Sequence, residues 1–168
     1  MGHIEERLTH LGLTLPPEVQ PPPGVVLPFV FVNVQGDRVV VSGHGPQSAD
    51  GPLAPQFGQV GRDVSLDEAV ESAHLAALSM LGSLQRELGT LDRITSWVRV
   101  FGMVNSAPDF DQQPTVINGF SDLILDVFGP EVGRHARSAV GMASLPFGIP
   151  VEVEAEVSIR VINRGPQS

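Results

Sequence analysis

The sequence of 168 residues contains no cysteine and no tyrosine, and because all ten of its basic Lys/Arg residues are arginine, it contains no lysine either. The absence of cysteine excludes disulfides, thiolate metal sites, iron–sulfur clusters and a cysteine nucleophile. The absence of lysine excludes Schiff-base chemistry, covalently held pyridoxal phosphate and the phosphate-binding lysine of a P-loop. Several large classes of enzyme are thereby ruled out.

Positive charge is scarce as well, since the formal net charge is −9 and the sequence pI is about 4.8. Such a charge repels phosphodiester backbones and anionic lipids, so we expect neither a nucleic-acid partner nor a membrane partner. The strongest apolar run, Val25–Val34, is much shorter than the ~20 residues of a membrane helix. The first residues lack the basic region and apolar run of a secretory signal. We therefore expect a cytoplasmic protein.

The overall composition, 42% hydrophobic and 17% charged, indicates one packed domain. Apolar residues spaced three to four apart predict a short helix over Ile4–Leu13. The prolines between positions 16 and 23 then predict a stiff connector. We therefore divide the chain into an N-terminal helical arm with its connector, residues 1–24, and an α+β domain, residues 25–168.

The pattern of apolar residues within this domain predicts five strands and two helices. A hairpin is expected from Val25–Val34 and Arg38–Ser42, a helix from the capping box of Ser65 and Glu68 to Gly89, a strand over Ile94–Val104, a helix from Asp111–Gln113 to Gly129-Pro130, and strands over His135–Leu145 and Pro150–Ile162. The order ββαβαββ predicts an α+β sheet with two helices on one face.

The last predicted strand carries three carboxylates on one face. Glu152, Glu154 and Glu156 alternate with apolar residues, so their side chains follow one another at intervals of about 6.6–6.8 Å. Three like charges this close are unfavourable unless water or arginine lies opposite them. The pattern alone favours a solvated sheet face, and it also fits the lining of a pocket or of a subunit interface.

Arg137 is a candidate anion-binding residue because small residues flank it in the run HARSAVG. A guanidinium can bind a carboxylate through two parallel hydrogen bonds, although the same side chain can also form an ordinary surface ion pair. His135, on the same face of this strand, fits a simple polar strand residue. The histidines show no short metal-binding spacing, so no metal site is expected.

Three segments in this order, VSGHGP, HARSAVG and LPFGIPVEVEAE, resemble the Rid (YjgF-like) family of reactive intermediate deaminases, also labelled L-PSP endoribonucleases. The resemblance runs from about Pro28 to Arg160. It implies a chorismate-mutase-like ββαβαββ fold and a homotrimer with ligand clefts between subunits. It further implies that the protein hydrolyses 2-aminoacrylate and related small enamines and imino acids to 2-keto acids and ammonia. This reaction needs no cofactor.

The resemblance also implies roles for individual residues. Arg137 corresponds to the arginine that clamps the substrate carboxylate, and Glu152 to the glutamate that holds the attacking water or relays a proton. Substrate contacts are implied for Phe29, Ser42, Gly43, His44, Asn118 and Ala139. Three of these positions depart from the family pattern, since Phe29 stands in place of a tyrosine, His44 in place of a glutamine and Ala139 where cysteine is common.

Two other functions remain open at this point. The missing tyrosine hydroxyl is compatible with a trimer that binds keto acids or other metabolites without turnover. Endoribonuclease activity, which the family label suggests, is the weaker alternative. An acidic chain lacks an electropositive track for RNA, and no lysine or catalytic histidine pair is present in the pattern.

Overall fold

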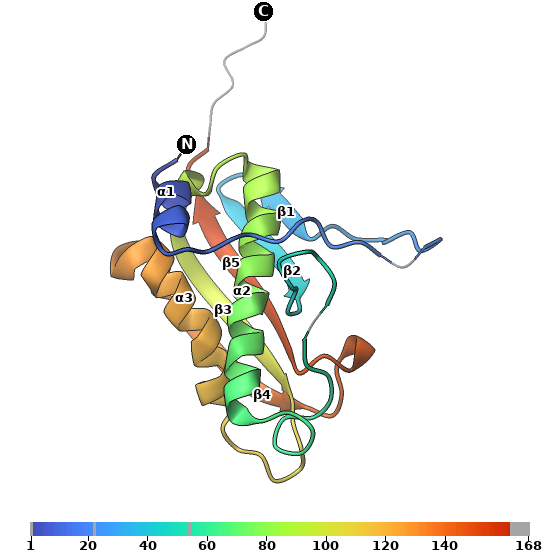
Figure 1. The fold of residues 1–168 in the computed structure, drawn as a ribbon. Helices are drawn as coiled ribbons and strands as arrows, with labels where there is room; N and C mark the ends of the chain where they lie inside the picture. The colour runs from blue at the N-terminus through green and yellow to red at the C-terminus, as the bar shows by residue number, and fades with distance from the viewer. Residues whose placement is uncertain (1, 22, 54, 162–168) are drawn as a thin grey trace, which may run out of the picture.

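The computed structural model describes residues 2–21, 23–53 and 55–161. They form a single five-stranded sheet with helices packed across one of its faces (Figure 1). In chain order the elements are α1 (His3–His10), β1 (Val32–Gln35), β2 (Arg38–His44), α2 (Leu66–Leu88), the short turn η1 (Leu91–Arg93), β3 (Ile94–Asn105), α3 (Gln113–Gly133), β4 (Ala136–Met142), the short turn η2 (Pro146–Gly148) and β5 (Val151–Ile159). The predicted α+β class and the predicted order of elements are confirmed.

The strands lie in the order β1-β2-β5-β3-β4. β1 and β2 form the expected hairpin, with Gly36 at φ 67° in the turn, a conformation that glycine adopts at little cost. β5 pairs antiparallel with both β2 and β3, whereas β4 runs parallel to β3 because α3 crosses over between them. β4 therefore forms one edge of the sheet, and β1 forms the other.

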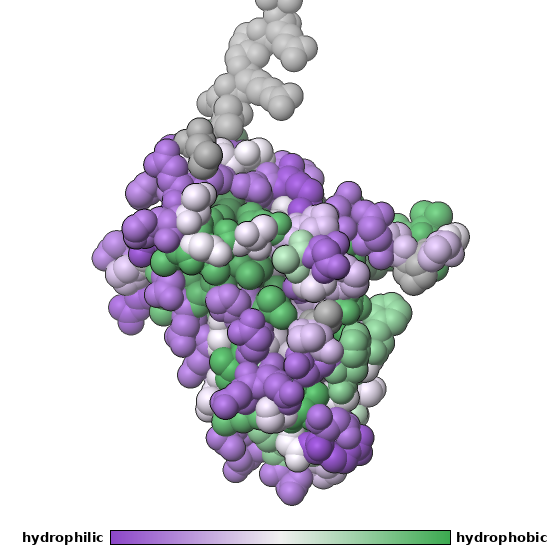
Figure 2. All heavy atoms as spheres, in the orientation of Figure 1, coloured by the Kyte–Doolittle hydropathy of each residue, from purple (hydrophilic) through white to green (hydrophobic). Residues whose placement is uncertain are grey.

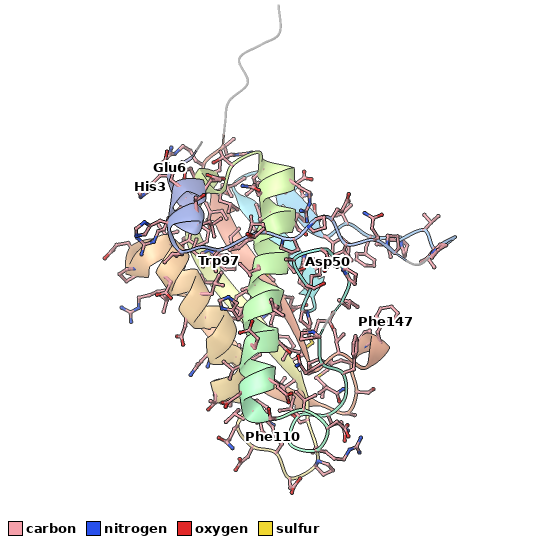
Figure 3. The ribbon with its side chains drawn as sticks, viewed as in Figure 1. His3, Glu6, Asp50, Trp97, Phe110 and Phe147 are labelled. Atoms are coloured by element: carbon pink, nitrogen blue, oxygen red, sulfur yellow. The ribbon has the colours of Figure 1, made fainter. Side chains whose placement is uncertain are left out.

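The two faces of this sheet differ in what covers them. Val151, Val153 and Val157 of β5 are fully buried beneath the helices, together with Trp97 of β3, which packs edge-on against Phe120 of α3 (Figure 3). The alternating glutamates of β5 point the opposite way. No helix of the described chain covers that second side, which we call the free face of the sheet. It is the face on which Glu152 lies.

α2 begins and ends where the sequence predicts. Ser65 accepts a hydrogen bond from the backbone N–H of Glu68 at 3.3 Å, and the Glu68 carboxylate accepts one from the backbone N–H of Ser65 at 2.8 Å. Gly89, at φ 81°, closes the helix. Both predicted signals are confirmed. They place α2 across the sheet beside α3.

Several predicted boundaries are wrong. The first strand begins at Val32 instead of Val25, because Pro28 has no N–H for a ladder; the segment before it projects from the body, with Val26 88% exposed (Figures 1 and 2). α3 continues past Gly129 to Gly133 through a kink at which φ of Gly129 is 73°. β4 and β5 are shorter than predicted at both ends, and Ile162 lies outside the described residues.

α1 adds a third helix to the two that we expected on the covered face. Its free backbone N–H groups are capped from far along the chain, since Asp92 accepts hydrogen bonds from His3 at 2.7 Å and from Ile4 at 2.8 Å. In return Glu5 accepts a bond from the backbone N–H of Leu91 at 2.8 Å. Leu8 is buried in the main core. Across the described parts of the chain, no helix has the length and hydropathy that crossing a bilayer requires.

Candidate active site

Glu152 lies on the free face, against the backbone of Gly43. A Cβ atom at Gly43 would overlap the Glu152 carboxylate, so any other residue here would force this carboxylate to move. The register between β2 and β5 shifts here, because three residue steps from Val41 to His44 face two steps from Ala155 to Val153. This β-bulge brings the backbone of Ser42 and Gly43 next to the carboxylate. We refer to Ser42, Gly43 and Glu152 as the glutamate cluster.

The three glutamates of β5 have different electrostatic surroundings. Arg38 donates two parallel hydrogen bonds to Glu156, from Nε to Oε1 at 2.6 Å and from Nη2 to Oε2 at 2.8 Å, and this partner lowers the pKa of Glu156. Glu154 lies 4.0 Å from Arg99. Glu152 forms no ion pair within the described chain, and its half-buried position, together with the nearby charge of Glu154, raises its pKa. Of these three glutamates, Glu152 is therefore the one that holds a proton most readily.

Arg137 extends from the edge strand β4 toward α3. Its Nη1 donates to Asn118 Oδ1 at 2.9 Å and to Ser121 Oγ at 3.1 Å, and its Nη2 donates to the backbone carbonyl of Pro114 at 3.3 Å. All three acceptors are neutral and all belong to α3. We refer to Asn118, Ser121 and Arg137 as the arginine cluster.

The guanidinium of Arg137 has hydrogen-bond donors that no residue of the described chain occupies. It carries five N–H donors, of which these bonds use three, so Nε–H and one Nη2–H have no acceptor in the described part of the chain. Arg137 also has no carboxylate partner there. The geometry thus presents a fixed positive charge with spare donors, which is what an anionic ligand requires.

The two clusters do not share a cavity within one chain. Arg137 is in register with Val100, a buried residue on the helix side of β3, whereas Glu152 is in register with Met103 on the free face. Side chains of successive strand residues point to opposite faces, so these two groups lie on opposite sides of the sheet. These two groups therefore do not converge within a single protomer.

Three of the predicted contact residues, Ser42, Phe29 and Ala139, lie in or beside these clusters. The Ser42 hydroxyl donates to the backbone carbonyl of Val30 at 2.8 Å, and Phe29 is 50% exposed next to Val30. Phe29 packs edge-on against Phe31, with ring centroids 5.6 Å apart. Ala139 lies two residues beyond Arg137 on β4, half-buried, in register with Gly102.

His44, which we expected to border the pocket, is instead buried beneath α2 with 1% of its surface exposed. Its Nδ1 donates to the carbonyl of Ser42 at 2.7 Å, and its Nε2 lies 2.9 Å from the Ser83 hydroxyl. Burial lowers the pKa of His44 to about 4. The extra residue of the bulge turns His44 to the helix side, so its side chain supports the backbone of Ser42 and does not reach the free face.

The sequence alone assigns no role in ligand binding to two residues that lie beside Arg137 in the structure, Ser121 and His135. The Ser121 hydroxyl that accepts from Arg137 also lies 3.0 Å from His135 Nε2, and His135 Nδ1 donates to the carbonyl of Gly133 at 2.7 Å. The spacing of Asn118 and Ser121, three residues apart on one helix, was a usable signal for a shared face. The approach of His135 depends on how the chain turns from α3 into β4, which no local pattern reveals.

Neither of two hollows on the described surface contains both clusters. A groove of about 390 Å³ between α2 and α3 is lined by Val70, His74 and Asp122 among others, and by no predicted site residue. A smaller hollow of about 200 Å³ on the free face includes Ser42 and Glu154. Within residues 2–21, 23–53 and 55–161, no three His, Asp or Glu side chains gather closely enough to hold a metal ion.

Comparison with known proteins places the chain among relatives of similar length. It is 41% identical to protein TCP17 of Trypanosoma cruzi over 158 residues, which covers 94% of this chain and 95% of that one. The crystal structure of Atu1372, a protein of unknown function from Agrobacterium tumefaciens, is 42% identical with a TM-score of 0.82, covering 94% and 92% of the two chains. A Shewanella oneidensis structure described as a "putative endoribonuclease" is 30% identical with the same TM-score, covering 94% and 100%.

A family model agrees with these relatives. The model described as "YjgF/chorismate mutase-like, putative endoribonuclease" matches residues 5–151, which include both clusters except for Glu152 at the border of the match. The predicted resemblance to Rid (YjgF-like) proteins is thereby confirmed. On its fold, its sequence match and its relatives, this chain belongs to the YjgF/chorismate-mutase-like family.

Proposed function

We propose that the protein hydrolyses 2-imino acids, and the enamines from which they form, to 2-keto acids and ammonia. The observation that carries this proposal is the Arg137 guanidinium, which three neutral oxygens of α3 hold in place while Nε–H and one Nη2–H remain without an acceptor in the described chain. A carboxylate next to the imine carbon is the ligand that such a group would anchor.

Arg38 of the same chain illustrates what the free donors of Arg137 can bind. Its Nε and Nη2 hold the two oxygens of Glu156 at 2.6 and 2.8 Å. In Arg137, the Nε–H and the remaining Nη2–H are the donors left over. A substrate carboxylate bound in this way would be oriented as well as neutralised, because two bonds fix its plane.

Glu152 would carry the proton transfers of the reaction. Its carboxylate takes a proton from water as the water oxygen bonds to C2 of the imine, and the imine nitrogen is protonated to an amine. The resulting carbinolamine loses ammonia as its hydroxyl becomes the carbonyl of the keto acid, so that imine plus water gives keto acid plus ammonia. A carboxyl with a raised pKa serves both the accepting and the donating steps.

The site would be completed by a second copy of the chain, because Arg137 and Glu152 lie on opposite faces of one sheet. We propose a homotrimer whose free faces turn inward, so that Arg137, on the edge strand β4 of one copy, meets the glutamate cluster of the next across the sheet edge. Exposed apolar side chains on the free face support this arrangement, among them Val40 at 40% and Val140 at 36% exposed. The helical face shows hydrophilic residues around a central apolar area (Figure 2).

A coupled assay tests the proposed reaction. A dehydratase generates iminopyruvate from serine, and the disappearance of the imine is followed with and without this protein. We expect Arg137→Ala and Glu152→Gln to reduce the rate to that of solvent hydrolysis. Arg62→Ala and Glu71→Gln, which remove the same side chains from exposed surface positions, should leave it unchanged. A wild-type protein that accelerates none of a panel of amino-acid-derived imines would show that the proposed reaction is wrong.

A binding protein without turnover is the second candidate, and Phe29 is the observation that favours it. The ring is half-exposed near Ser42 and has no hydroxyl to offer a substrate. Calorimetry with pyruvate or 2-ketobutyrate distinguishes the candidates, since a binding module would bind keto acids through Arg137 and leave imines intact. RNA cleavage by a highly purified sample that is lost in Glu152→Gln would instead support the ribonuclease activity in the family description.

A further inference from the structure

We infer that Ser121 and His135 are positioning residues, which hold the Arg137 guanidinium in the orientation that a ligand carboxylate requires. This inference rests on the proposed anchoring role of Arg137. It adds two residues that make no contact with the substrate. They act as a short chain of hydrogen bonds that runs from the backbone of Gly133 to the guanidinium.

The carbonyl of Gly133 determines which group donates and which accepts in each of these hydrogen bonds. The carbonyl of Gly133 can only accept, so the hydrogen on His135 lies on Nδ1, 2.7 Å away. In the neutral ring Nε2 is then an acceptor, and the Ser121 hydroxyl donates to it across 3.0 Å. Burial and the charge of Arg137 lower the pKa of His135, which favours this neutral form.

The serine hydroxyl is thereby turned in the direction that suits Arg137. Its hydrogen points to His135, so its lone pairs face the Nη1–H of Arg137 at 3.1 Å. Ser121 is 8% exposed, so solvent offers little substitute for this acceptor. Asn118, the other side chain that holds Nη1, is exposed, and its bond at 2.9 Å competes with water. Ser121 is therefore the firmer of the two side-chain supports.

This arrangement predicts a particular kinetic pattern. The bond between Arg137 and the substrate carboxylate is present in the bound substrate and in the transition state alike. Loosening Arg137 therefore weakens the binding of both, which raises KM and leaves kcat nearly unchanged. A purely structural role for Ser121 or His135 would lower thermal stability without this selective change in KM.

The experiment compares four variants of the full-length protein as purified. Ser121→Ala removes the acceptor, and Ser121→Thr keeps a hydroxyl. His135→Asn keeps an amide donor for Gly133 but lacks the ring nitrogen that reaches Ser121. Ser72→Ala is the matched control, because Ser72 is a buried helix serine whose hydroxyl bonds only the carbonyl of Glu68. For each variant KM and kcat for imines are measured, with the Kd of pyruvate from calorimetry.

We expect Ser121→Ala and His135→Asn to raise KM and the pyruvate Kd about tenfold, the usual effect of losing one hydrogen bond to a charged group. Their kcat should stay within about twofold of wild type. Ser121→Thr should restore most of the affinity, and Ser72→Ala should change neither constant. In ¹⁵N NMR spectra, the addition of pyruvate should shift the His135 Nε2 resonance of the wild type. It should not shift this resonance in Arg137→Ala.

The outcomes separate this inference from the proposed reaction. Pyruvate binding that weakens in both variants, in a protein that hydrolyses no imine, supports the inference and refutes the reaction. Imine hydrolysis with unchanged KM and Kd in both variants refutes the inference and leaves the reaction standing. A fall in kcat at constant KM also refutes it, and so does a wild-type protein that binds no carboxylate.

Discussion

The carboxylate of Glu152 occupies the space that a side chain at Gly43 would need. The contact joins neighbouring strands at the β-bulge, where the backbone of β2 departs from regular pairing with β5. The absence of a side chain at Gly43 thus leaves the proposed proton carrier its position.

Gly43→Ala should displace the Glu152 carboxylate and reduce imine hydrolysis by roughly 100-fold, because misplacement of a catalytic group by about 1 Å has effects of this size. Gly43 does not have a positive φ, so the new methyl group acts through the overlap and not through backbone strain. Steady-state kinetics measure the effect. Ser42→Ala, which alters the neighbouring residue without filling this space, is the control and should retain much more activity.

Glu152→Gln should abolish activity and yet make the protein more stable at neutral pH. The pKa of Glu152 is raised above its usual value of 4.5, so the folded state binds this proton more tightly than the unfolded chain does. The stability contributed by the protonated carboxyl is present below pH 4.5 and is lost as pH rises through the folded-state pKa. Glutamine stays neutral throughout this range.

Denaturant unfolding of wild type and Glu152→Gln at a series of pH values measures this effect. The difference in free energy of unfolding should be small near pH 4 and should grow in favour of the variant above pH 4.5. Glu71→Gln, at an exposed site on α2, should show no such trend. A difference that shrinks with rising pH would contradict the electrostatic description of Glu152.

His44 should make the fold sensitive to mild acid. Its folded-state pKa of about 4 lies below the usual 6.5, so the unfolded chain takes up the proton first. The stability contributed by the neutral ring is fully present above pH 6.5 and is lost as pH falls toward 4, by roughly 3 kcal/mol in all. His44→Gln should flatten the pH dependence of unfolding in this window, and an unchanged slope would contradict the prediction.

Charge placed on the free face should separate the proposed subunits. Val140 is 36% exposed on that face. If the free faces meet in the proposed trimer, Val140→Arg would bury a positive charge in the subunit interface, which is unfavourable. We expect light scattering to give the mass of three chains for the wild type and of one for the variant. Asp122→Arg on the helical face is the control and should not change the mass.

Much of the fold could be predicted because its signals are local. The alternation of Val151 and Val153 with glutamates identified a strand with one buried face, and Ser65 with Glu68 identified the start of α2. The prediction for the start of β1 was wrong because the apolar, β-branched residues around Pro28 are typical of a strand when only the local sequence is considered. The proline and the exposed course of this segment prevent pairing.

The candidate site was harder to predict because its parts depend on pairing between distant segments. Arg137 and Glu152 could be named from short motifs, but their opposite orientations follow from the register of β3 with both neighbours. The burial of His44 follows from a bulge that leaves no mark in the sequence except a small residue. Ser121 meets His135 only because α3 and β4 are packed together.

The caps of α1 have a consequence for the order in which the chain acquires its structure during synthesis. A helix of 8 residues is marginal in isolation, and the carboxylate that caps it belongs to Asp92, which follows His3 by 89 positions. When its first residues leave the ribosome, the partner that would stabilise them has not yet been made. α1 is thus among the last elements to settle, because it becomes stable only after the segment that carries Asp92 has been synthesised.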